Sequence, residues 1–112
     1  MDIEIKEYND EGFMPLIVCN KWRVALINSA ERLLEKNLSK IERHIKTDEV
    51  FVLLSGKATL FIGKEKARYE MEQGKIYNVK CGVWHAIALE EETKVLVIED
   101  ADTEDFTERI YE

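Results

Sequence analysis

Four side chains in this sequence have the types and spacing needed to bind a metal ion. The stretch "IERHIKTDEVFVLLSG", residues 41–56, contains Glu42, His44 and Glu49, and the second of the two histidines, His85, lies in "VWHAIAL". Imidazole nitrogens and carboxylate oxygens are ligands for divalent manganese, iron, zinc and nickel. Structural roles are the alternative: a solvated His44, a core His85 bonded to a backbone carbonyl, and glutamates on a turn or an exposed strand face.

The side on which each candidate lies follows in part from strand parity. Residues two apart on a strand face the same side, so Glu42 and His44 point together. His85 shares its parity with the apolar residues Val83 and Ile87, so we expect it to face the interior. Parity alone does not decide whether Glu42 and His44 face inward or outward.

Most of the chain alternates with a period of two residues, which is typical of β-strands. The predicted strands are "IEIKEY" (3–8), "MPLIVC" (14–19), "WRVALIN" (22–28), "VFVLLS" (50–55), "ATLFIG" (58–63), "KARYEMEQG" (66–74), "KIYNV" (75–79), "VWHAIAL" (83–89) and "TKVLVIED" (93–100). Short strands bounded by turns favour a sandwich or barrel over alternating strand–helix units.

Two segments depart from this period. "NSAERLLEKNLSKI", residues 28–41, has leucines at helical spacing, and Asn28 and Glu31 are placed like a capping box, so we expect a short helix around 30–37. In the tail "TEDFTERIYE", Phe106 and Ile110 lie four apart. This spacing indicates a terminal helix that docks on the sheet or on a second subunit.

Composition limits the classes of partner. The chain has 112 residues, 46% of them hydrophobic, which fits one globular domain over residues 1–112. A net charge of −7 argues against nucleic acid as a partner, because phosphate binding needs clustered Lys and Arg.

We expect no membrane span, since no long apolar run occurs. We also expect no secretion signal, and therefore reduced Cys19 and Cys81 and a cytoplasmic location.

Two segments resemble the motifs of the cupin superfamily. The first motif is His-x-His, three or four residues, Glu, six residues, Gly; the second is Gly, five residues, Pro-x-Gly, two residues, His, three residues, Asn. Six positions match at this spacing: His44, Glu49, Gly56, Gly74, Gly82 and His85. The resemblance covers about residues 40–98. It departs from the family where Glu42 replaces the first His, Lys80 the Pro and Leu89 the Asn.

The resemblance implies an all-β, cupin-like antiparallel jelly-roll barrel with a divalent metal in its mouth. Carried over by position, the ligands are His44, Glu49 and His85, and Glu42 is a fourth ligand or a general base. The metal is manganese, iron, zinc or nickel, or none, since many small cupins hold no metal. The resemblance also implies a homodimer in which N-terminal strands pair across a two-fold axis.

Three functions follow from these expectations. The first is a metal-dependent isomerase, lyase or dioxygenase acting on a small polar molecule. The second is a module that binds a small ligand without turning it over, and the third is a structural dimer with a vestigial site. Arg23 would bind a carboxylate or phosphate if it lay inside the barrel mouth, although the solvent face is the more usual place for an arginine.

Overall fold

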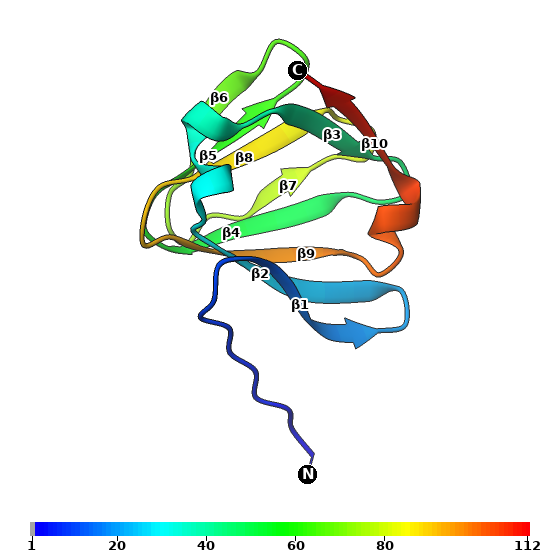
Figure 1. The fold of residues 1–112 in the computed structure, drawn as a ribbon. Helices are drawn as coiled ribbons and strands as arrows, with labels where there is room; N and C mark the ends of the chain where they lie inside the picture. Colours follow the sequence, from blue (N-terminus) through cyan, green and yellow to red (C-terminus); the bar gives the residue numbers. More distant parts are fainter. Residues whose placement is uncertain (1) are drawn as a thin grey trace.

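In the computed structural model, which describes residues 2–112, two five-stranded antiparallel sheets pack face to face (Figure 1). The first sheet contains, in spatial order, β1 (Gly12–Cys19), β2 (Trp22–Asn28), β9 (Lys94–Asp100), β4 (Glu49–Ser55) and β7 (Tyr77–Val79). The second contains β10 (Thr107–Tyr111), β3 (Lys40–His44), β8 (His85–Leu89), β5 (Ala58–Ile62) and β6 (Ala67–Glu70). The predicted all-β jelly roll is confirmed, with its strands arranged as two sheets.

The core lies between the two sheets and is built from alternate residues of their strands. Val95 and Val97 of β9 are fully buried, and they pack with Phe51 of β4 and with Leu60 and Leu89 of the second sheet. This alternation follows from strand geometry, because each strand turns alternate side chains to the interior.

The helical segment predicted near 30–37 consists of two 3-10 turns. These are η1 (Glu31–Leu33) and η2 (Glu35–Asn37). The predicted capping box is absent: Ala30 is the N-cap residue and makes no side-chain capping bond. Asn28 instead ends β2, and its amide donates hydrogen bonds to the backbone carbonyls of Tyr8 and Asp10. Among residues 2–112 there is no helix with the length and hydrophobicity that a bilayer crossing requires.

The expected terminal α-helix is wrong. A 3-10 turn, η3 (Thr103–Phe106), leads into β10, which pairs with β3. The register sets Thr107 opposite His44 and Arg109 opposite Glu42. This pairing covers an edge of β3 that would otherwise be exposed, and it brings the acidic tail beside the candidate site.

The strand predicted at residues 3–8 is also wrong. Residues 2–9 form no helix or strand, and this arm projects away from the sheets (Figure 1). Its apolar side chains Ile3 and Ile5 are 63% and 83% exposed. Alternation alone did not make a strand here, because a strand needs a neighbouring edge to accept its backbone hydrogen bonds.

Gly56, in the turn between β4 and β5, lies against the chain just before β9. Its φ is +82°, and a Cβ placed there would lie 2.3 Å from Thr93 Oγ1 and 2.6 Å from the Glu92 carbonyl oxygen. Thr93 Oγ1 in turn accepts a hydrogen bond from the Lys57 backbone N–H at 3.0 Å. Only glycine fits both the backbone conformation and this close approach.

We therefore expect Gly56→Ala to lower the free energy of unfolding by roughly 3 kcal/mol, from left-handed backbone strain together with overpacking. Gly74→Ala is the matched control: Gly74 has a φ of +85°, but a Cβ added to it would meet nothing within 4 Å. Only the backbone strain of about 1–2 kcal/mol applies there. Urea denaturation measures both variants, and equal losses would show that the contact with Thr93 is unimportant.

Candidate metal centre

Three of the four predicted side chains converge on one point. Glu49 Oε1 lies 2.7 Å from His44 Nε2 and 3.0 Å from His85 Nε2. All three residues are buried. Two imidazole nitrogens and a carboxylate oxygen aimed at the same position form an arrangement that can hold a divalent cation.

The strand ends place these groups. His44 is the last residue of β3, Glu49 is the first of β4, and His85 is the first of β8. Asp48 lies in the turn before β4 and links it to the chain before β8. Its carboxylate accepts hydrogen bonds from the Asn78 side chain and from the Cys81 backbone N–H. The segment before Glu49 is thus tied to the segment before His85.

The hydrogen bonds of His85 define which ring nitrogen carries its proton. Nδ1 lies 3.0 Å from the Val83 carbonyl oxygen, which can only accept, so Nδ1 must be the donor. In neutral His85 the lone pair of Nε2 therefore faces the Glu49 carboxylate, which is also an acceptor. That contact needs either a second proton on the ring or a cation between the two groups.

His44 is oriented in the same way by the C-terminal segment. Its Nδ1 lies 2.7 Å from Thr107 Oγ1, and that hydroxyl already donates its hydrogen to the Thr103 carbonyl at 2.6 Å. Thr107 must therefore accept from Nδ1–H, and Nε2 of neutral His44 carries the lone pair. This Nε2 is buried and, despite its short distance to Glu49, has no hydrogen-bond partner of good geometry. An orphaned buried nitrogen facing a carboxylate fits a metal ligand.

The pKa values of Glu49 and His85 reflect the close contact between these side chains. Burial alone would raise the pKa of the Glu49 carboxyl, but close polar contacts with His44 and His85 outweigh it and hold that pKa well below its usual value. Burial would lower the pKa of His85, but its hydrogen bond with Glu49 and the Glu49 charge together raise it. A metal ion would therefore displace a proton from His85 as it binds.

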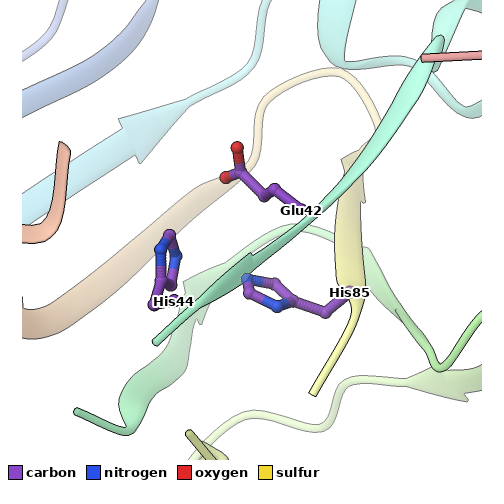
Figure 2. Close-up of side chains that lie close together, drawn as sticks. All are labelled: Glu42, His44 and His85. Carbon is purple, nitrogen blue, oxygen red and sulfur yellow. The ribbon is translucent and has the colours of Figure 1, made fainter. Parts of the chain in front are cut away.

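Glu42, the fourth predicted residue, lies at the edge of this cluster. Figure 2 shows Glu42 and His44 projecting from the same side of β3, with the His85 ring reaching toward them from β8. One ligand atom from each of Glu42, His44 and His85 lies within 4.8 Å of the others. The Glu42 carboxylate is partly exposed and accepts a hydrogen bond from Arg109 at 3.2 Å.

Glu99 lines the cavity, and Arg23 lies beside it; the sequence did not single them out as a pair. Arg23 is buried, contrary to the expectation of a solvent-facing side chain, and its Nε donates to Glu99 Oε2 at 2.7 Å. Burial raises the pKa of Glu99 to about 8, and the neighbouring Glu49 carboxylate adds to the rise against the opposing effect of Arg23. Glu99 has the same strand parity as the buried Val95 and Val97. This parity was the sequence signal that could have placed Glu99 on the inner face.

The cluster opens into a cavity of about 430 Å³ between the sheets. Glu42, Glu49, His85 and Glu99 form its polar end. Its apolar lining comes from both sheets and from η1: Phe13, Ile27, Leu33, Phe51 and Ile87. A cavity of this size and mixed lining is suited to a small molecule.

Comparisons with solved structures show the same fold. A cupin-2 domain protein from Shewanella frigidimarina aligns with a TM-score of 0.64 and 21% identity, over 83% of this chain and 84% of that one. A candidate mannose-6-phosphate isomerase from Ralstonia eutropha gives 0.63 and 20%, over 88% and 91%. Salicylate 1,2-dioxygenase from Pseudoaminobacter salicylatoxidans gives 0.63 and 12%, over 89% of this chain and 29% of that one.

The family assignment comes from the sequence comparison. No curated protein matches the chain. A family model described as "Cupin domain", however, matches residues 33–99, which is more than half of the chain. This stretch includes both motif segments and the strands that carry His44, Glu49 and His85. The chain therefore belongs to the cupin family.

Proposed function

We propose that this protein is a metal-dependent enzyme that acts on a small polar molecule, with His44, Glu49 and His85 as the metal ligands. The observation that carries the proposal is the convergence of two imidazole Nε2 atoms on one buried carboxylate oxygen, with both Nδ1 atoms committed to acceptors. Such outer hydrogen bonds orient metal-binding histidines and set their tautomer.

The ligand set indicates a class of chemistry. Two imidazoles and one carboxylate leave open positions on an octahedral ion, and manganese and iron suit such a site, while zinc and nickel remain candidates. A bound ion would polarise a coordinated oxygen of the substrate. An isomerase, lyase or dioxygenase could use this, and the structural neighbours include enzymes described as an isomerase and a dioxygenase.

Glu42 is suited to move a proton in this cavity, and a role as fourth ligand is the alternative. Its carboxylate lines the cavity beside His85. Arg109 holds one of its oxygens, Oε2, and this leaves the other oxygen for a substrate or water. A positioned carboxylate within hydrogen-bond reach of the reacting group can act as a general base.

The alternative is a protein that binds a small ligand without catalysis, or a dimer with a vestigial site. The specific observation in its favour is that Glu49 and a protonated His85 form an ion pair without any metal. In that case the cavity would still accept a small molecule, and metal content distinguishes the two functions.

We also propose that the protein forms a homodimer through the outer face of the first sheet. This outer face consists of the residues that alternate with the core positions of its strands: Met14, Trp22, Val24, Leu26, Val50, Val52, Leu54, Leu96 and Ile98. All of them are apolar and at least partly accessible. Sheets that are apolar on both faces are normally covered on both.

The N-terminal arm supports a second copy as the cover. It is anchored at Tyr8, whose backbone carbonyl accepts from Asn28, and residues 2–7 extend beyond that point with Ile3 and Ile5 exposed (Figure 1). An extended segment with apolar side chains can lie along a partner's sheet and add to its edge.

Exposed, unpaired Cys19 and Cys81 accord with the further proposal of a reducing, cytoplasmic location.

The first prediction from the proposed function concerns metal content. Protein purified without a tag, chelator or metal column should carry near-stoichiometric metal by mass spectrometry, while His44→Ala and His85→Ala should carry none and remain folded by circular dichroism. Glu108→Ala, on the outward-facing ion pair with Arg43, should keep its metal. A His85→Ala protein that unfolds but retains its metal would make His85 structural. Metal-free parent protein, even after soaking with iron, manganese, zinc and nickel, would favour the ligand-binding alternative.

The second prediction concerns the orientation of His44. Thr107→Val removes the acceptor for Nδ1–H, so affinity for the metal retained by the parent should fall about tenfold to a hundredfold. Thr107→Ser keeps the hydroxyl and should bind within about threefold of the parent. Titration calorimetry compares them, and equal affinity of all three proteins would exclude a positioning role for Thr107.

The third prediction concerns the dimer. Sedimentation velocity should show the parent at about twice its monomer mass of 13.1 kDa. Ile98→Glu, which buries a charge in the outer face, should sediment as a monomer. Tyr69→Glu, at an exposed position of the second sheet, should remain dimeric. A parent protein that is monomeric at tens of micromolar would overturn this proposal.

A further inference from the structure

Glu99 lies in a row of charged side chains that crosses the inner face of the first sheet. The register of β2 with β9 sets Arg23 opposite Glu99, and the register of β4 with β9 pairs Val50 with Ile98, which brings Glu49 beside Glu99 on the next position. Side chains directly opposite each other on neighbouring strands are in contact range. Like charges at such positions are normally destabilising, so the pair of glutamates requires an explanation.

Without a metal, protons neutralise this row, because the pKa of Glu99 is raised to about 8 and a protonated His85 pairs with Glu49. The Glu49 and Glu99 side chains are only 7% and 4% exposed, so neither carboxylate is well solvated. Arg23 supplies one positive charge, and both of its short contacts, from Nε at 2.7 Å and from Nη2 at 2.6 Å, go to Glu99 Oε2. Glu99 Oε1 is left without a contact to Arg23. A metal held by His44, Glu49 and His85 would displace these protons, and the two buried carboxylates would then share the guanidinium and the ion.

Glu42 differs from Glu99 in each of these respects. Its side chain is 28% exposed. Its carboxylate has two cations nearby, Arg109 at 3.2 Å and Lys40 at 4.0 Å. Glu42 is thus more exposed than Glu99, and solvent and two surface cations can neutralise its charge without a metal.

We propose that Glu99 is a fourth protein ligand of the metal, with Arg23 as the positioning residue that holds its Oε2 and leaves Oε1 for the ion. One ligand atom from each of His44, Glu49 and Glu99 lies within 4.8 Å of the others, which is close enough for a shared ion. The inference rests on the proposed function, because it needs the metal held by His44, Glu49 and His85. It leaves Glu42 as the group available for proton transfer.

A second carboxylate changes the character of the site. Two imidazoles and two carboxylates form a harder, more negative ligand set than the triad alone, and oxygen ligands favour manganese and iron over metals that prefer softer donors. The site would also keep fewer open positions for a substrate than the three-residue set.

The test compares two glutamine variants by calorimetric titration of the metal-free protein with Mn²⁺. Glu99→Gln should weaken binding at least about tenfold, because a neutral amide oxygen is a poor ligand. Glu42→Gln should stay within about threefold of the parent. Circular dichroism and thermal melting of the metal-free variants verify that they are folded.

Glu99→Asp separates ligation from long-range charge. It keeps the negative charge but withdraws the carboxylate by one methylene, so a direct ligand predicts weakened binding here as well. Affinity equal to that of the parent in Glu99→Asp would show an effect of charge alone and would overturn the inference.

The remaining outcomes are distinguishable. If the parent binds Mn²⁺ and Glu99→Gln binds it equally well, Glu99 is not a ligand, although the proposed function stands. If only Glu42→Gln loses the metal, the fourth ligand is Glu42. If the parent binds no metal, the proposed function and this inference both fail.

Discussion

The contact between the Glu49 carboxylate and the two imidazoles is the interaction on which the cavity depends. A carboxylate that is this deeply buried is costly unless it is paired, and here both histidines approach the same oxygen at 2.7 and 3.0 Å. The pairing holds the ends of β3, β4 and β8 together at one point. It also keeps the polar groups of the cavity from collapsing onto the apolar core beside them.

Holding two rings in one orientation requires partners from elsewhere in the chain. Val83, just before β8, accepts from His85, while Thr107 of β10 accepts from His44. The C-terminal segment is therefore part of the cavity wall, since Arg109 on the same strand also holds Glu42. This arrangement explains why an acidic tail packs beside acidic residues: its Arg109 and its Thr107 face the site, and the Glu104 carboxylate pairs with Arg109.

The inner and outer faces of the first sheet differ in composition. Its inner face changes from apolar to charged along the strands, from Val95 and Val97 to Glu99, and so forms both the core and the end of the cavity. Its outer face is apolar over the middle of the central strands, which is why we propose a second copy there. A dimer through this face would stabilise the sheet that carries Glu49 without covering the cavity on its other side.

Local alternation in the sequence determined the short strands of a sandwich or barrel and the inward side of His85. The resemblance of two segments to the cupin motifs then implied the jelly roll and the meeting of His44, Glu49 and His85, because the motif spacing is a local property of the chain. The local patterns misjudged residues 3–8 and 103–112, where alternation or four-residue spacing is compatible with several structures and the neighbouring edge decides. Only the tertiary structure brought Arg23, Glu99 and Thr107 to the site. They come from strands far apart in the chain, and pairing register and sheet packing, which no local pattern encodes, set their contacts.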